Sequence, residues 1–275
     1  MELSNDRKEI LKKIEEYEKT QKWDIDVEND PPTVTLLPNK VDYLNKKFSS
    51  KLLSFFANKV AVSYFDKEIK KGNLIIEKII GLDNFKNLKT GAIITCNHFS
   101  VYDNYVIYKA FQKDLGKKRL YKIIREGNFT SMKGLYGFFF RHCNTLPLSS
   151  NRETMKLFLK AVNTLLTRGE KILIYPEQAM WWNYKKPRPL KSGAFKFAST
   201  NSVPVLPCFI TMRDSKKVAP DGSYYQKFTL HISKPIYPEK EKTVQENALM
   251  LMEKNYEIWK NLYEDVYKTK LEYLK

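Results

Sequence analysis

The sequence GAIITCNHFSVYDNYVIYKAF, residues 91–111, begins as an apolar run and continues with a helical pattern. The pattern predicts a strand at residues 91–97 and a helix within 99–112. His98 and Asp103 lie five positions apart, and on one continuous helix about 500° of rotation would put them on different faces. They can meet only if His98 lies in a loop and Asp103 in the first helical turn. We therefore predict a strand–loop–helix junction here.

The alternation of strand and helix continues on both sides of this junction. Apolar runs predict strands at 73–82, 119–126, 143–148, 171–177, 203–212 and 225–234, and helical spacing predicts helices at 127–137, 151–168 and 193–201. Ser150-Asn151-Arg152-Glu153 has the form of a capping box and marks the start of the helix at 151–168. This order favours an α/β fold with a mixed, largely parallel sheet flanked by helices. Open sheets of this kind place their sites at the carboxyl ends of strands.

The two ends of the chain are predicted to be helical. Residues 1–22 form a polar helix with opposite charges four apart, such as Glu15 and Lys19. Residues 23–40 form a linker with an extended piece at 33–37, and 41–66 form an amphipathic helix or helix pair. Residues 242–275 form a long terminal helix. We expect an N-terminal membrane-associating region at 1–72, an α/β domain at 73–240, and a C-terminal helix at 241–275 packed on that domain.

The charge of the chain indicates an anionic partner. It has 48 Lys and Arg against 31 Asp and Glu, a net charge of +17, and residues 111–200 hold 18 of the basic and 5 of the acidic groups. Such a field suits anionic lipid, nucleic acid, a phosphorylated substrate or an acidic protein. The chain lacks a zinc finger, a basic heptad region and an aromatic RNA-binding motif, which argues against nucleic acid.

Other features bear on cellular location. The first residues carry charges throughout and show no apolar core of a signal peptide. No run reaches the roughly 18 apolar residues of a membrane span. Cys96, Cys143 and Cys208 are widely spaced and form no CxxC motif, which indicates free thiols in a reducing compartment. Three scattered histidines do not predict a metal site. We expect a cytoplasmic protein on the inner face of the cell membrane.

The pair His98 and Asp103 can support base chemistry. A carboxylate on one imidazole nitrogen fixes the tautomer and supports the imidazolium, so the other nitrogen can act as a general base. No serine or cysteine motif marks a nucleophile, so the simplest use is direct deprotonation of a substrate hydroxyl. A histidine with only a structural role satisfies the same spacing.

Three further segments favour the catalytic interpretation. They are Gly137-Phe138-Phe139-Phe140-Arg141, Tyr175-Pro176-Glu177-Gln178 and Val203-Pro204-Val205-Leu206-Pro207. Together with NHFSVYD they resemble, in order and approximate spacing, the four blocks of the glycerolipid acyltransferase family, which includes bacterial 1-acylglycerol-3-phosphate acyltransferase. The resemblance covers about residues 73–235, and the first block matches the NHxSxxD pattern at every defined position.

The resemblance implies acyl transfer from a thioester, either acyl-CoA or acyl carrier protein, to a lysolipid hydroxyl without an acyl-enzyme. It implies His98 as general base with Asp103 as its orienting partner, and Arg141 and Glu177 as acceptor-binding residues. Pro207 matches the fourth-block proline, whose role is structural. No cofactor or metal is implied, and no residue is assigned to donor binding.

One departure from the family concerns the acceptor. The third block is usually FPEGTR, but here Gln178, Ala179 and Met180 follow Glu177, so the arginine is missing. Either a later cation replaces it or the acceptor differs from lysophosphatidic acid; the candidates are Lys185, Lys186, Arg188 and Lys191. We favour Lys191 because it precedes a helix start. Trp181 and Trp182 either face the lipid interface or pack over the site.

The sequence therefore predicts a peripheral membrane O-acyltransferase of phospholipid synthesis. The most natural acceptor is 1-acylglycerol-3-phosphate, with another lysolipid or a glycolipid as the alternative. A protein from a different class, a lipid-surface binding protein without catalysis, could share this fold. It would not need both His98 and Asp103.

Overall fold

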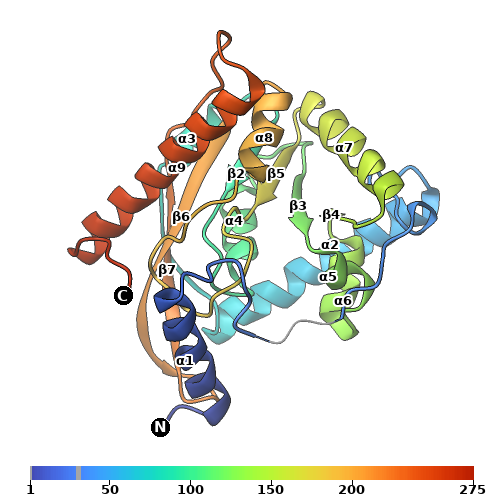
Figure 1. Ribbon diagram of the computed structural model, residues 1–275. Coiled ribbons are helices and arrows are strands. Elements are labelled where there is room, and N and C mark those ends of the chain that lie inside the picture. Colours follow the sequence, from blue (N-terminus) through green and yellow to red (C-terminus); the bar gives the residue numbers. More distant parts are fainter. Residues whose placement is uncertain (1, 29–31) are drawn as a thin grey trace.

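Seven strands form one sheet in the computed structural model, which describes residues 2–28 and 32–275 (Figure 1). The strands are β1 (Ile75–Ile80), β2 (Ala92–Thr95), β3 (Leu120–Ile124), β4 (Thr145–Pro147), β5 (Lys171–Ile174), β6 (Val205–Val218) and β7 (Tyr224–Ile232). Their order is β1-β7-β6-β2-β5-β3-β4. Strands β6 and β7 are antiparallel, and each other neighbouring pair in the described chain is parallel. The predicted mixed, largely parallel sheet is confirmed.

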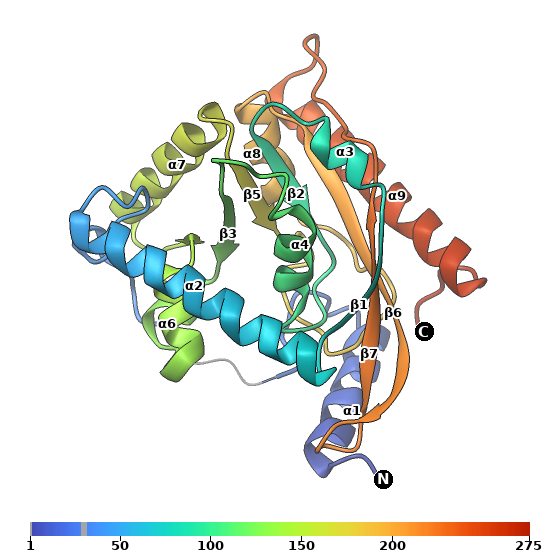
Figure 2. The same ribbon diagram turned by 180° about the vertical axis from the view of Figure 1, so that it is seen from behind.

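Helices cover both faces of this sheet. Helices α7 (Arg152–Thr167), α8 (Gly193–Thr200) and α9 (Val244–Tyr267) lie on one face, and α2 (Phe48–Lys71), α3 (Leu82–Lys86) and α4 (Asp103–Phe111) lie on the other (Figures 1 and 2). Because side chains alternate along a strand, Ile93 packs with the first group and Ile94 with the second. Burial on both faces explains why the central strands are apolar throughout.

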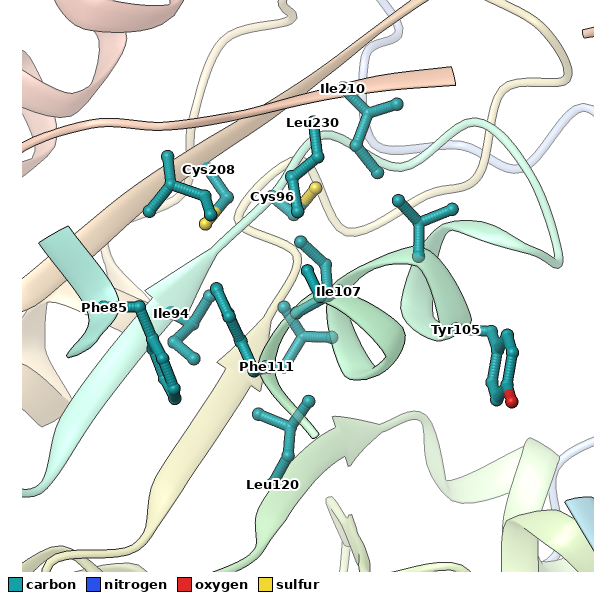
Figure 3. Close-up of a cluster of buried hydrophobic side chains, with 14 of the residues drawn as sticks. Phe85, Ile94, Cys96, Tyr105, Ile107, Phe111, Leu120, Cys208, Ile210 and Leu230 are labelled. Atoms are coloured by element: carbon teal, nitrogen blue, oxygen red, sulfur yellow. The ribbon is translucent and has the colours of Figure 1, made fainter. Parts of the chain in front are cut away.

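Helix α4 is held on the sheet by a buried cluster of apolar side chains. Ile107 and Phe111 of α4 face the side chains of α3 and of the sheet, whereas Tyr105 points away from them (Figure 3) and stacks on Phe65 of α2 with ring centroids 4.6 Å apart. The rings of Phe85 and Phe111 stack with their centroids 3.8 Å apart. This packing fixes the position of α4 on β2, and with it the first residue of the helix, Asp103.

The predicted helix starts were partly correct. Helix α7 begins as expected, but Asn151 caps it: its side-chain oxygen accepts from the backbone N–H groups of Glu153 and Thr154, each at 3.0 Å. The predicted box from Ser150 is wrong, because the Ser150 N–H donates to Glu126 at 3.1 Å. A capping box forms instead at Thr243 and starts α9.

The segment predicted as a helix at 127–137 is divided into two helices. They are α5 (Glu126–Thr130) and α6 (Gly134–His142), and the whole GFFFR motif lies in α6. Arg141 is therefore a residue of the last helical turn, and β4 follows after a short connection.

The N-terminal region contains one helix and an irregular crossing. Helix α1 (Asn5–Lys19) confirms the predicted polar helix, and its Lys19 donates to Glu15 at 2.7 Å. The linker at 23–40 ends in a 3-10 turn, η1 (Pro38–Lys40), and residues 29–31, including Pro31, lie outside the described residues. The extended piece at 33–37 pairs with no strand. It is held where the Leu36 N–H donates to Glu126 at 2.7 Å.

The predicted helix at 41–66 begins later and ends later than expected. Residues 41–47 form a turn, in which the Asp42 carboxylate accepts from the N–H groups of Lys46 and Lys47 at 3.0 and 2.9 Å. Helix α2 then runs to Lys71. No helix among the described residues is long and apolar enough to cross a membrane.

The C-terminal helix is shorter than predicted. Helix α9 packs on α8 and β6 and ends at Tyr267, because Lys268 adopts left-handed φ of 53°. The remaining tail turns back over the molecule. The Tyr273 hydroxyl donates to the Pro187 carbonyl at 2.6 Å, and the Leu274 N–H donates to Glu18 of α1 at 3.0 Å. The tail and α1 thus both contact the segment that follows β5.

Candidate active site

The site is built where two neighbouring parallel strands end. Thr95 of β2 is paired with Ile174 of β5, so the segments that follow these strands leave the sheet side by side. One is the His98 loop, residues 96–102, and the other is the Glu177 segment, residues 175–191. This is the edge of an open sheet at which sites are expected.

His98 and Asp103 are in direct contact. Nδ1 of His98 lies 2.7 Å from Oδ2 of Asp103. Asp103 is the first residue of α4 and is fully buried, whereas 23% of the His98 side chain is exposed. The loop folds around the carboxylate, whose Oδ2 also accepts from the N–H groups of Phe99 and Ser100 at 3.2 and 3.3 Å. The loop position of His98 and the helical position of Asp103 are those that the spacing predicted.

This contact determines the tautomer of the histidine. An ionised carboxylate can only accept hydrogen bonds, so the proton of the neutral imidazole lies on Nδ1. Nε2 then carries a lone pair, and the partly exposed ring can present it to a substrate. The arrangement can remove a proton from a hydroxyl and can hold the resulting imidazolium beside a negative charge.

Tyr175 contacts both members of the pair. Its ring stacks on the imidazole of His98, with centroids 4.0 Å apart and planes 13° from parallel. Its hydroxyl donates to Oδ1 of Asp103 at 2.8 Å. Burial raises the pKa of the Tyr175 hydroxyl well above its ordinary value, and the nearby Asp103 charge adds to the effect. The hydroxyl therefore stays protonated and acts as a donor. Sequence analysis did not single out this residue.

Asn97 fixes the start of the His98 loop. Its side-chain amide donates to the Ile210 carbonyl at 3.0 Å and accepts from the Ile210 N–H at 2.8 Å. The side chain thus continues the pairing of β2 with β6 beyond the end of β2. As a result, the residue next to His98 is attached to the sheet.

Glu177 and Arg188 form a buried ion pair beneath the loop. Arg188 is 1% exposed and Glu177 is 3% exposed, and their side chains meet at 3.0 Å. The carboxylate accepts from the N–H groups of His98 at 3.0 Å and Arg188 at 2.8 Å. The guanidinium donates to the carbonyls of His98 at 3.3 Å and Trp23 at 2.9 Å. Both backbone groups of His98 are therefore held by this pair.

The chain is similar to known acyltransferases. The acyltransferase family model matches residues 77–211, which include all four blocks and the first half of β6. The chloroplastic 1-acyl-sn-glycerol-3-phosphate acyltransferase BAT2 of Brassica napus is 29% identical over 171 residues, which are 59% of this chain and 45% of that protein. The chain is similar to the glycerolipid acyltransferase family. It matches less than half the length of this curated relative.

A solved structure shares the fold of this chain. The crystal structure of the 1-acyl-sn-glycerophosphate (LPA) acyltransferase PlsC from Thermotoga maritima superposes with a TM-score of 0.52 at 20% identity. The match covers 82% of this chain and 91% of that one. At this identity the likeness concerns the fold.

Of the four cations that could replace the missing third-block arginine, Arg188 lies beside Glu177. Arg188 reaches the Glu177 carboxylate from eleven positions further along the chain. Because it is buried and occupied by carbonyls and a carboxylate, it supports the loop and does not present a free cation. The planar guanidinium suits this task, since one side chain binds several acceptors at fixed angles.

Replacing Arg188 should strongly destabilise the protein. In Arg188→Met the Glu177 carboxylate stays buried without its charge partner, and breaking a buried pair costs about 3–5 kcal/mol. We expect a loss of that size in the free energy of unfolding, measured by urea denaturation. The control is Arg213→Met, which breaks an ion pair between Arg213 and Glu77 at the surface and should cost much less. Equal losses in the two variants would contradict a supporting role for Arg188.

The charged groups of the other two acceptor-binding candidates, Lys191 and Arg141, do not lie beside the Glu177 carboxylate. The Lys191 N–H donates to the Pro176 carbonyl at 2.9 Å, but its ammonium pairs with Asp24 at 2.9 Å in a half-exposed position. This hydrogen bond lowers the pKa of the Asp24 carboxyl. Arg141 is exposed and donates to the Met132 carbonyl at 3.0 Å. It borders a cavity of about 110 Å³ whose lining includes neither His98 nor Glu177.

The two neighbouring tryptophans differ in their surroundings. Trp181 is fully buried and donates to the Ile25 carbonyl at 2.8 Å, with the Arg188 guanidinium over its ring. A place for Trp181 in an aromatic belt at the lipid interface is therefore wrong. Trp182 packs against the Arg7 guanidinium at 4.5 Å. Both residues attach α1 and the linker to the Glu177 segment.

Proposed function

We propose that this chain moves a fatty acyl group from an acyl thioester to the hydroxyl of a lysolipid, with His98 as the general base. The observation that supports this most is the contact of 2.7 Å between His98 Nδ1 and the buried Asp103 carboxylate. Similarity to the acyltransferase family narrows the reaction class, and the 1-acyl-sn-glycerol-3-phosphate acyltransferase among its relatives suggests the acceptor class.

The transfer can proceed without an acyl-enzyme. Nε2 of His98 takes the proton of the acceptor hydroxyl while its oxygen attacks the thioester carbonyl carbon. The tetrahedral intermediate collapses with loss of the thiolate, which takes the proton back from the imidazolium. Cys96, two residues before His98, is fully buried, and burial raises the pKa of its thiol. It is therefore poorly suited to act as a nucleophile.

We infer that the acceptor is 1-acylglycerol-3-phosphate or a related lysolipid. Arg141, Glu177 and Lys191 remain the predicted acceptor-binding residues, but Glu177 already receives three donors from the protein. A phosphate would therefore have to be bound by Lys191 after release from Asp24, or by Arg141. A neutral lysolipid or a glycolipid would need neither cation. The donor is proposed to be acyl-CoA or acyl carrier protein, with no further cofactor.

We also propose that the protein binds the surface of an anionic membrane, on the cytoplasmic face, through α2. This helix turns apolar side chains outward: Phe48 is 79% exposed, Phe55 55% and Phe56 52%. The residues it buries are Ser54, Ala57, Phe65 and Glu68. Lys51 and Lys59 lie among the exposed rings. A mixed face of aromatic and basic residues is typical of helices that lie in a membrane interface.

Removing the exposed rings of α2 should weaken membrane binding. We expect Phe55→Ser with Phe56→Ser to reduce partitioning onto anionic vesicles about tenfold or more, since two half-exposed rings lose apolar contact. Vesicle flotation measures this effect. The control is Leu157→Ser with Leu159→Ser on α7, where the leucines are 43% and 47% exposed. Binding of wild type should also weaken in 1 M salt, where the Debye length is about 3 Å. Equal flotation of both double variants would contradict the assignment to α2.

An activity panel tests the proposed reaction. Purified protein is incubated with labelled oleoyl-CoA or oleoyl acyl carrier protein and with lysolipids that carry different head groups. We expect a diacyl lipid from at least one lysolipid, and 1-acylglycerol-3-phosphate is the first choice. A protein that binds the vesicles but yields no acylated product with any pair of substrates would be the lipid-surface binding protein without catalysis.

A further inference from the structure

We infer that Tyr175 is a positioning residue that tunes the basicity of His98 through Asp103. Its hydroxyl binds Oδ1 of Asp103 at 2.8 Å, and its ring lies 4.0 Å from the imidazole. The inference rests on the proposed function for its kinetic consequences, but its effect on His98 can be measured without substrate.

The two carboxylate oxygens of Asp103 accept hydrogen bonds from different parts of the site. Oδ2 binds His98 and the N–H groups of Phe99 and Ser100, which shape the loop. Oδ1 receives the hydroxyl of Tyr175 from the neighbouring segment. The phenol therefore draws negative charge toward the oxygen that faces away from the histidine. Less charge on Oδ2 means weaker support for the imidazolium form of His98.

The other ionisable groups near His98 do not alter the charge that Asp103 presents to the imidazole. Glu177 and Arg188 contact only the backbone of His98, and they form an ion pair with each other. Cys96 is buried, and its raised thiol pKa keeps it neutral. Tyr175 therefore changes the basicity of the imidazole through the charge on Asp103 Oδ2.

The stacked ring adds an orienting contact. The nearly parallel phenol and imidazole planes restrict rotation of His98 about its own axis, so Nε2 keeps its direction toward the exposed side. The third block of the acyltransferase family has phenylalanine in the usual FPEGTR, where this chain has Tyr175. A phenylalanine here should therefore preserve the fold and the stacking, and should remove only the hydroxyl.

The pKa of His98 in Tyr175→Phe tests the inference. We expect it to rise by about 0.5–1 unit, because the carboxylate loses a donor on Oδ1 and its charge concentrates on Oδ2. NMR titration of the imidazole measures this, and since the chain has three histidines, His98→Ala assigns the signal. The control is Tyr105→Phe, which removes a similar hydroxyl that donates to Asp66 at 2.9 Å. It should leave the pKa of His98 unchanged.

Kinetics give a second readout that a purely structural role would not change. In Tyr175→Phe the acid limb of kcat/KM should move to higher pH by the same amount, so the rate falls at the pH values of that limb, with the acceptor KM unchanged. In Tyr175→Leu, which also loses the stacking, kcat should fall further. If Tyr175→Phe and Tyr105→Phe both give the wild-type pKa of His98, the inference is wrong. If the NMR shift is seen but wild type acylates no lysolipid, the proposed reaction fails and the role of Tyr175 stands.

Discussion

His98→Ala should abolish acyl transfer and leave the protein folded. The imidazole is the base that takes the proton of the acceptor hydroxyl, and loss of a general base costs about 10²–10⁴-fold in rate or more. The fold should tolerate the change because the Asp103 carboxylate keeps three donors: the N–H groups of Phe99 and Ser100 and the hydroxyl of Tyr175. Initial rates of diacyl lipid formation and thermal unfolding measure the two effects.

A control separates loss of the base from loss of structure. His142→Ala changes a histidine of α6 that does not line the His98 loop, and it should keep the wild-type rate. If His98→Ala acylated the lysolipid at close to the wild-type rate while melting at the same temperature, another group would have to be the base.

Asp103→Asn should lower the rate by about 10²-fold or more, through the charge rather than the shape of the side chain. The three donors around Oδ2 require an oxygen at that position, so the amide nitrogen of the variant should face the Tyr175 oxygen. His98 then keeps its tautomer but loses the negative charge that stabilises its protonated form. Steady-state rates at several pH values measure the loss.

The direction of the pH shift distinguishes this variant from the change at Tyr175. In Asp103→Asn the pKa of His98 should fall, and the acid limb of kcat/KM should move to lower pH. In Tyr175→Phe both should rise. An Asp103→Asn variant that retained the wild-type rate within a few-fold would show that the carboxylate is dispensable.

Local patterns predicted most of the fold. The apolar runs at 91–97 and 171–177 became β2 and β5 because strands buried on both faces need continuous apolar sequence. The His98 and Asp103 contact was also local, since a loop and one helical turn determine it. Sequence reasoning was weaker at helix ends. Ser150 and Thr243 both precede a glutamate by three positions, but only Thr243 forms the capping box.

The parts of the site that the sequence missed depend on contacts between distant segments. Tyr175 meets Asp103 across 72 positions, and Arg188 meets the His98 carbonyl across 90. Neither contact leaves a periodic signal. The missing third-block arginine indicated a replacement cation among four candidates. Arg188 differs from the other three because it is buried. Its burial results from the packing of the N-terminal region and the C-terminal tail around the Glu177 segment, which the sequence does not predict.

A mass balance across four reaction mixtures tests direct acyl transfer by the His98 base. Wild type and His98→Ala are each mixed with acyl-CoA, with and without 1-acylglycerol-3-phosphate, and lipid product, free thiol and protein mass are measured. We expect diacyl lipid and free thiol in equal amounts, only with wild type and lysolipid together, and an unchanged protein mass. An acylated protein, or equal product from His98→Ala, would contradict direct transfer by the His98 base.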